Sequence, residues 1–261
     1  MAIDMKSDIR SAMSMHPNIW FRRNTYFVRR ILRFVLRKIT QSKNLEFEIP
    51  KWNSFSQFQN DLNRNGYVYV ENFLTFSSAE SIRKNWPKSR FFTPIGKNED
   101  HKTSDRGLLC DFGKPSFDEQ KNPAIWALYR MFLSDDFAIE LGKLCGDGIA
   151  RYPYHMLAQE SYWGSGLAPH RDSEDERFRN KINFIYFVDA NGLGWDAGGT
   201  SILKTNTFEE PIFIPQNLIN SCLFYFSESE LFHGFPQIKF GNYRKNVISH
   251  FCEELKSNLN A

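Results

Sequence analysis

The chain has 261 residues, a length that suits one large domain with a substantial hydrophobic core. Phenylalanine is frequent, at 25 residues, and aromatic residues make up 16% of the chain, which is typical of β-rich domains whose sheets pack through wide side chains. Cys110, Cys145, Cys222 and Cys252 have no paired spacing, which argues against a disulfide framework or a zinc ribbon and favours reduced thiols in a cytoplasmic protein.

The net charge of +3 hides an uneven distribution along the chain. Residues 1–45 contain ten Lys or Arg and two Asp, so this segment carries +8 and residues 46–261 carry −5. We therefore divide the chain into a basic N-terminal segment, residues 1–45, and a single folded domain, residues 46–261.

The basic segment predicts an amphipathic helix over residues 19–39, with apolar residues at helical spacing on one face and arginines largely on the other. Its longest apolar runs are three residues, too short for a membrane-spanning helix or a signal-peptide core. The helix could pack on the folded domain, lie on an anionic membrane surface as a peripheral contact, or bind a partner. We find no aromatic-interleaved basic motif and expect no nucleic-acid partner.

Three helices and one strand are expected in the first half of the domain. A short helix is predicted over residues 54–63 and a strand over 66–74, followed by a helix with Ser77 as N-cap and Glu80 three residues later. Residues 91–117 are rich in Gly and Pro and predict a loop able to cover an active site. Residues 123–145 carry apolar side chains at helical spacing and predict a single helix.

After Gly148 the pattern changes to short strands separated by turns. Strands are predicted over residues 151–159, 181–188, 199–203, 211–214, 219–226 and 243–251. Short strands that follow helices favour an α+β fold with a double-stranded β-helix (jelly-roll, cupin-like) core and flanking helices.

Residues 166–172 predict the end of a further strand, on which His170 and Asp172 point to the same side because they are two residues apart. His233 follows the apolar run 222–226, and Arg244 lies eleven residues beyond it. Two imidazoles and one carboxylate suit ferrous iron with open positions, and zinc would accept the same ligands. The arginine favours iron, since a guanidinium can grip the far carboxylate of a keto acid whose near end chelates the metal.

Residues 170–251, about a third of the chain, resemble the catalytic core of the iron(II)- and 2-oxoglutarate-dependent oxygenases, in the prolyl-hydroxylase-like and phytanoyl-hydroxylase-like branches. The resemblance rests on the His-Arg-Asp triplet, on residues 181–189, 195–203 and 222–226, and on His233, Arg244 and Phe251. Residues 65–74 resemble the first strand of many such enzymes.

The resemblance implies a role for each matching position. His170, Asp172 and His233 would ligate Fe(II), and Arg244 would bind the distal carboxylate of 2-oxoglutarate. Iron halogenases that resemble this family have Gly or Ala in place of the carboxylate, so Asp172 favours hydroxylation over halogenation.

Three further residues would line the co-substrate pocket. Many prolyl-hydroxylase relatives have a tyrosine where Phe187 stands, so Asn183 or Thr200 would supply the second hydrogen bond to the acid, and Asn246 shares the face of Arg244. Six polar or aromatic residues are expected to flank the mouth of this pocket: Tyr154, Gln159, Glu160, Tyr162, Trp163 and Trp195.

The implied activity is a dioxygenase that uses Fe(II), 2-oxoglutarate and O₂ to hydroxylate an unactivated C–H bond of a small molecule or of a saccharide or glycolipid. Desaturation, cyclisation or epimerisation would use the same residues. A peptidyl (prolyl-type) hydroxylase is the alternative enzyme. A non-catalytic jelly-roll binding protein and a zinc hydrolase remain open as other classes, because a fold does not fix a function.

Overall fold

The computed structural model describes residues 48–94, 101–102, 106–111, 114–115, 122–172, 181–227 and 230–253. The basic segment 1–45, with the helix expected over residues 19–39, lies outside the described residues. No helix among the described residues is long and apolar enough to cross a membrane.

The described helices are short and precede most of the strands. They are η1 Ser56–Phe58, α3 Gln59–Asn65, α4 Phe76–Lys84, η2 Ser89–Phe91, α5 Pro123–Leu133, α6 Asp135–Cys145 and, later in the chain, η3 Gly194–Ala197.

The prediction of one helix over residues 123–145 is wrong, because Ser134 separates α5 from α6. Ser134 has an extended backbone (ψ 145°), and its Oγ accepts a hydrogen bond from the backbone N–H of Phe137 at 3.3 Å. Asp135 and Asp136 then occupy the first turn of α6, where negative charge is favoured. Apolar residues recur at helical spacing on both sides of Ser134, so the sequence pattern did not indicate the break between the two helices.

The predicted N-cap of α4 is also wrong by two residues. The helix begins at Phe76, and Thr75 holds the cap position with an extended backbone (ψ 150°). The Thr75 hydroxyl donates to the Ser78 hydroxyl at 3.1 Å and does not accept a capping hydrogen bond from a backbone N–H of the first turn. The Ser77–Glu80 capping signature therefore lies inside the first turn.

Two antiparallel sheets form the body of the domain. The larger has the order β1-β11-β8-β13-β6-β4-β2, with β5 beside β4, and the smaller has the order β10-β9-β12-β7-β3. The strands of the larger sheet are β1 Tyr67–Val70, β2 Thr93–Pro94, β4 Arg106–Asp111, β5 Lys114–Pro115, β6 Arg151–Tyr162, β8 Ile182–Asn191, β11 Ser221–Phe226 and β13 Tyr243–Glu253. Those of the smaller sheet are β3 His101–Lys102, β7 Gly166–His170, β9 Ser201–Leu203, β10 Pro211–Phe213 and β12 Phe232–Phe235.

Five of these strands were not expected from the sequence: the two-residue strands β2, β3 and β5, and the longer strands β4 and β12. β4 lies within the predicted loop 91–117 and extends the larger sheet by pairing with β6. β12 contains His233 and is held between β7 and β9. Both strands depend on neighbours that are distant in sequence, so local composition did not indicate them.

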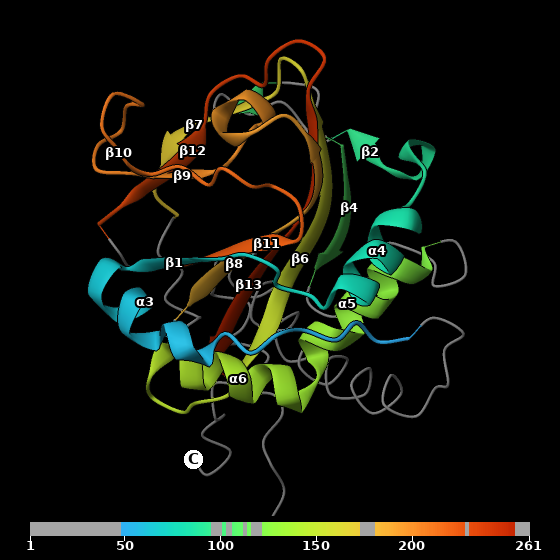
Figure 1. Cartoon of the computed structure of the whole chain (residues 1–261), viewed down its shortest axis with the longest axis vertical. Helices are drawn as coiled ribbons and strands as arrows, with labels where there is room; N and C mark the ends of the chain where they lie inside the picture. Colours follow the sequence, from blue (N-terminus) through green and yellow to red (C-terminus); the bar gives the residue numbers. More distant parts are fainter. Residues whose placement is uncertain are drawn as a thin grey trace, which may run out of the picture.

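Alternation along β8 divides the hydrophobic core into two parts. Ile182, Phe184 and Tyr186 pack with side chains of the helices, whereas Ile185 and Phe187 pack with residues of β9 and β11. In Figure 1, α3 and α6 lie below the larger sheet, and β7, β9 and β12 lie above it. The larger sheet thus has helices on one face and the smaller sheet on the other.

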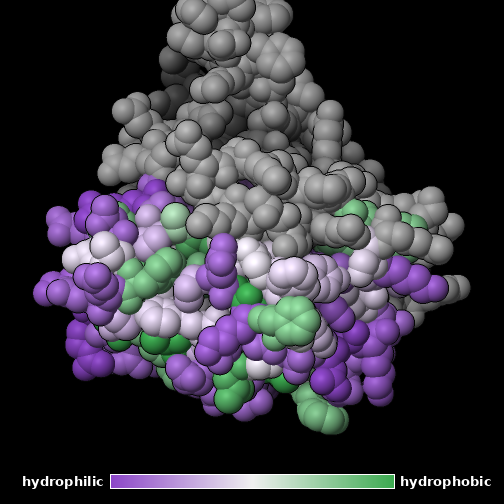
Figure 2. All heavy atoms as spheres, turned by 90° about the horizontal axis from the view of Figure 1, so that it is seen from above, coloured by the Kyte–Doolittle hydropathy of each residue, from purple (hydrophilic) through white to green (hydrophobic). Residues whose placement is uncertain are grey.

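The described surface has no broad apolar face in the view of Figure 2, where hydrophobic side chains are scattered among hydrophilic ones. The largest exposed apolar side chains, including Phe76 and Phe240, come from separate parts of the chain.

Phe184 is buried at the centre of the helix-side core, and its ring contacts those of five other phenylalanines. We expect Phe184→Ala to lower the free energy of unfolding by about 3–5 kcal/mol, because the lost contacts leave a cavity. Phe76→Ala is the matched control, since that ring is 83% exposed, and should change the stability by less than about 0.5 kcal/mol. Urea unfolding measures both; equal losses in the two variants would contradict this description of the core.

Candidate metal centre and adjoining pocket

Strand pairing in the smaller sheet brings two histidines together from distant parts of the sequence. His170 ends β7 and His233 lies on β12, and the two are direct partners in the antiparallel ladder. Their rings are 4.2 Å apart between centroids and inclined by 54°. Both imidazoles therefore lie on the same face of this sheet.

Asp172 completes the cluster two residues after β7 ends. Its Oδ1 lies 3.9 Å from Nε2 of His170 and 3.6 Å from Nε2 of His233. The ligand atoms of the three residues all lie within 4.8 Å of one another, a spacing at which one metal ion can bind all three. The expected strand 166–172 is thus two residues shorter in the structure, but His170 and Asp172 still converge.

Two hydrogen bonds orient the ligands of this centre. Nδ1 of His170 lies 3.0 Å from the carbonyl oxygen of Ala168, which favours a proton on Nδ1 and leaves Nε2 to face an ion. Asn183 on β8 donates its side-chain Nδ2–H to Oδ2 of Asp172, so Oδ1 remains for the metal. In the structure, therefore, the side chain of Asn183 contacts Asp172.

The surroundings keep the buried imidazole neutral. Burial, together with the smaller effect of the neighbouring His170, lowers the pKa of His233 to about 3. A neutral imidazole keeps the nitrogen lone pair that a metal requires. Burial, followed by the negative charge of Asp172, raises the pKa of Tyr225, whose ring lies 4.8 Å from that of His233.

Arg244 lies on β13 and is only 2% exposed. Its guanidinium donates to the carbonyl oxygen of Gly198 and, at 3.0 Å, to the hydroxyl of Thr200. The same group stacks 3.8 Å above the ring centroid of Phe235, two residues from His233 on β12. The structure thus brings Arg244 and Thr200 together beside the metal centre.

Buried polar atoms adjoin this arginine. Asn246 is fully buried and donates to Gln159 Oε1 at 3.3 Å, while its Oδ1 has no hydrogen-bond partner among the described residues. Ser161, the ladder partner of Arg244, is also buried, and its Oγ has no partner within the same residues. Such orphaned groups indicate a missing ligand, and a carboxylate held by Arg244 would suit them. The sequence did not indicate Ser161; only the β6–β13 register does.

The six residues expected at the mouth do not all lie at one place, and Tyr154 is the one that lies beside His250. Gln159 faces Asn246, but Glu160 on the next position accepts hydrogen bonds from Trp86 at 3.1 Å and Tyr162 at 2.9 Å. Trp195 donates to Ser201 at 3.0 Å, and Trp163 packs on the exposed Phe240. Gln159 and Glu160 have different neighbours because successive residues of a strand point to opposite faces of the sheet.

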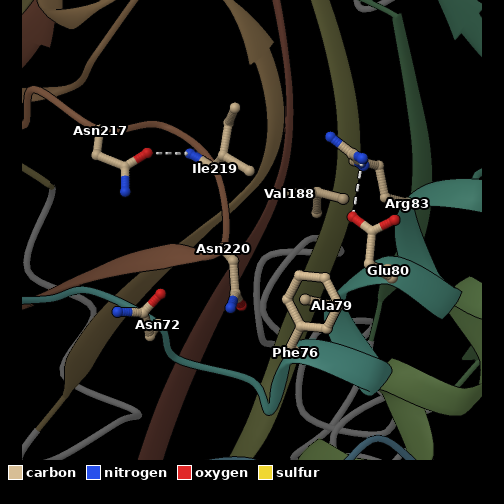
Figure 3. A pocket seen from close by; sticks show the side chains of 9 residues that line it. All are labelled: Asn72, Phe76, Ala79, Glu80, Arg83, Val188, Asn217, Ile219 and Asn220. Atoms are coloured by element: carbon tan, nitrogen blue, oxygen red, sulfur yellow. Dashed lines mark hydrogen bonds and ion pairs between the residues drawn. The ribbon is translucent and has the colours of Figure 1, made fainter.

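A separate pocket of about 310 Å³ lies between α4 and the strands of the larger sheet (Figure 3). Among its polar side chains, Glu80 pairs with Arg83 at 2.8 Å, and Asn220 bonds both the N–H and the carbonyl oxygen of Leu74. Val188 lines this pocket from the helix side of the larger sheet, so the pocket is not part of the metal centre.

No family model and no curated protein sequence matches the chain. Among solved structures, it is similar to a prolyl hydroxylase from Trichoplax adhaerens in complex with a hypoxia-inducible-factor peptide (TM-score 0.58, 18% identity, 79% of this chain and 92% of that one). It is also similar to a Pseudomonas putida prolyl-4-hydroxylase (TM-score 0.53, 13% identity, 76% of this chain and 98% of that one). A third similar structure is HygX from Streptomyces hygroscopicus with nickel, 2-oxoglutarate and hygromycin B bound (TM-score 0.55, 10% identity, 76% of this chain and 87% of that one). The chain has the fold of the 2-oxoglutarate- and iron(II)-dependent oxygenases.

Asn183→Ala removes the donor that orients Asp172, and we expect it to weaken metal binding by about 10- to 100-fold. The measurement is an anaerobic titration of the metal-free protein with ferrous iron or cobalt(II). Asn191, at the far end of the same strand, donates to the carbonyl oxygen of Gly241, and the control variant Asn191→Ala should leave the affinity unchanged. Unchanged affinity in Asn183→Ala would show that the contact does not support the metal site.

Proposed function

We propose that this chain is an Fe(II)- and 2-oxoglutarate-dependent dioxygenase that hydroxylates an unactivated C–H bond of a polar small molecule or saccharide. The observation that carries the proposal is the convergence of His170, Asp172 and His233 beside the buried Arg244. In the overall reaction one oxygen atom of O₂ enters the new hydroxyl group, the other enters succinate, and 2-oxoglutarate loses CO₂. Iron, when bound, supplies the redox chemistry that splits O₂.

The protein's own residues hold the reactants in place. His170, Asp172 and His233 would occupy one face of the metal and leave positions for the keto acid and O₂. Arg244 and the Thr200 hydroxyl would hold the distal carboxylate, with Ser161 and Asn246 as further hydrogen-bonding groups. The aromatic and aliphatic residues between the sheets exclude water around these groups.

The finer features predicted from the sequence belong to the same proposal. The two sheets would be the halves of a double-stranded β-helix. A reducing cytoplasm would keep the iron ferrous, and the segment 1–45 would act as a separate anchor to a membrane surface or partner. The peptidyl hydroxylase alternative draws its support from similar prolyl hydroxylases, one of them in complex with a peptide.

Anaerobic addition of ferrous iron and 2-oxoglutarate to the full chain tests the proposal. A visible charge-transfer band is expected, and His170→Ala or His233→Ala should abolish both the band and iron-dependent succinate formation. Absence of the band in the unaltered protein would favour a non-catalytic binding protein. Activity with zinc but not with iron, unaffected by Arg244→Ala, would indicate a hydrolase.

Arg244→Ala should weaken 2-oxoglutarate binding by about 2–5 kcal/mol, because it removes the buried partner of a carboxylate. Titration of the charge-transfer band with 2-oxoglutarate gives the affinity. Lys245→Met is the matched control, since the Lys245 amine lies on the other face of β13, 3.5 Å from Asp189. An affinity for 2-oxoglutarate that is the same in Arg244→Ala as in the control would refute the role of Arg244.

A further inference from the structure

The site opens toward one end of β6 and β13. Arg244 and Asn246 on β13 are buried, as are their partners on β6, whereas Ile248 and His250 further along are partly exposed. On β6, His155 opposite His250 is also partly exposed. A substrate would therefore reach the metal from the end of these strands that carries His250.

His250 lies beside the metal ligands. It is the ladder partner of Asn183, which donates to Asp172. The register of β6 against β13 shifts at this point, so that Tyr154 is inserted between the residues paired with His250 and Phe251. Bulges of this kind turn a side chain toward a site, and here the Tyr154 hydroxyl lies 3.4 Å from Nδ1 of His250.

Lys181 adds a buried positive charge to the same wall. It immediately precedes β8 and is only 5% exposed. Counting along the chain, it shares the strand face of Asn183, two residues later. No carboxylate among the described residues lies within ion-pair distance of its amine.

The charges around His250 support this placement. Burial, and after it the neighbouring His155, lowers the pKa of His250 to about 4; His233 and Lys181 act in the same direction, and Asp172 acts in the opposite one. Lys181 stands two residues before Asn183, the ladder partner of His250, so it lies diagonally across from His250 at a distance that long side chains can span. Asp172, the acid in this group, is the proposed metal ligand, so its charge would be neutralised by the ion.

We propose that Lys181 and His250 bind an anionic group of the substrate, a carboxylate or a phosphate, and hold it at the entrance beside the metal. The inference rests on the proposed function and narrows its substrate class to acidic or phosphorylated small molecules. A buried ammonium group is costly unless an opposite charge meets it, and a substrate anion would provide that charge. A prolyl peptide offers only neutral amides at the reacting residue and fits this entrance less well.

Inorganic phosphate is the probe for this subsite. It is titrated without oxygen into the full chain loaded with ferrous iron and 2-oxoglutarate, and the ³¹P line width is measured, because paramagnetic iron broadens the signal of a nearby phosphate. Saturable broadening is expected. Lys181→Met should lower the phosphate affinity obtained from the titration roughly 10- to 100-fold, the usual contribution of a charge-assisted hydrogen bond. Lys181→Arg keeps the positive charge and should retain most of that affinity. His250→Phe, which keeps a ring at that position, should also lower the phosphate affinity.

Lys245→Met again serves as the matched control, since it removes one lysine from the opposite face of the same sheet. Absence of saturable broadening in the unaltered protein, or equal broadening in Lys181→Met and Lys245→Met, would overturn the inference. The charge-transfer band recorded on the same samples reports separately on the proposed function. If that band does not form, calorimetry of phosphate binding to the metal-free chain, with the same variants, still decides whether Lys181 binds an anion.

Discussion

The antiparallel pairing of β7 with β12 is the constraint on which the candidate site depends. It places His170 directly opposite His233 and allows Asp172, just past the end of β7, to approach both rings. The smaller sheet contributes the histidines, and the larger sheet contributes the amide of Asn183 that holds the carboxylate. A metal site made this way needs both sheets at their correct separation. The packing between the sheets therefore sets the positions of the candidate ligands.

Positive charge flanks the metal centre on both sides along the strands of the larger sheet. Arg244 is buried and held by a carbonyl, a hydroxyl and an aromatic ring, and Lys181 stands two residues before Asn183, diagonally across from His250. The two residues differ in a way that suits their positions. A guanidinium presents a planar fork to one fixed carboxylate, whereas an ammonium is a compact charge on a flexible stem that can adapt to different anions.

The glycines around Arg244 show how closely the backbone is fitted there. Gly198 has a positive φ of 83°, and a Cβ on it would lie 2.8 Å from the Ile238 side chain. This conformation is open to glycine without strain, and it turns the Gly198 carbonyl oxygen toward the guanidinium. The Gly-Gly-Thr segment that resembles the oxygenase family thus has a structural role: it supplies the two oxygen atoms that accept hydrogen bonds from Arg244.

Local sequence by itself determined the strands with clear alternation and the three residues of the candidate metal site. The two-residue spacing of His170 and Asp172 and the apolar runs of β8, β11 and β13 carry their own periodicity. Tertiary structure alone decided the break at Ser134, the strands β4 and β12, and the approach of Ser161, His250 and Lys181 to the site. The physical reason is that these features depend on ladder register and on contacts between distant segments, which no local pattern encodes.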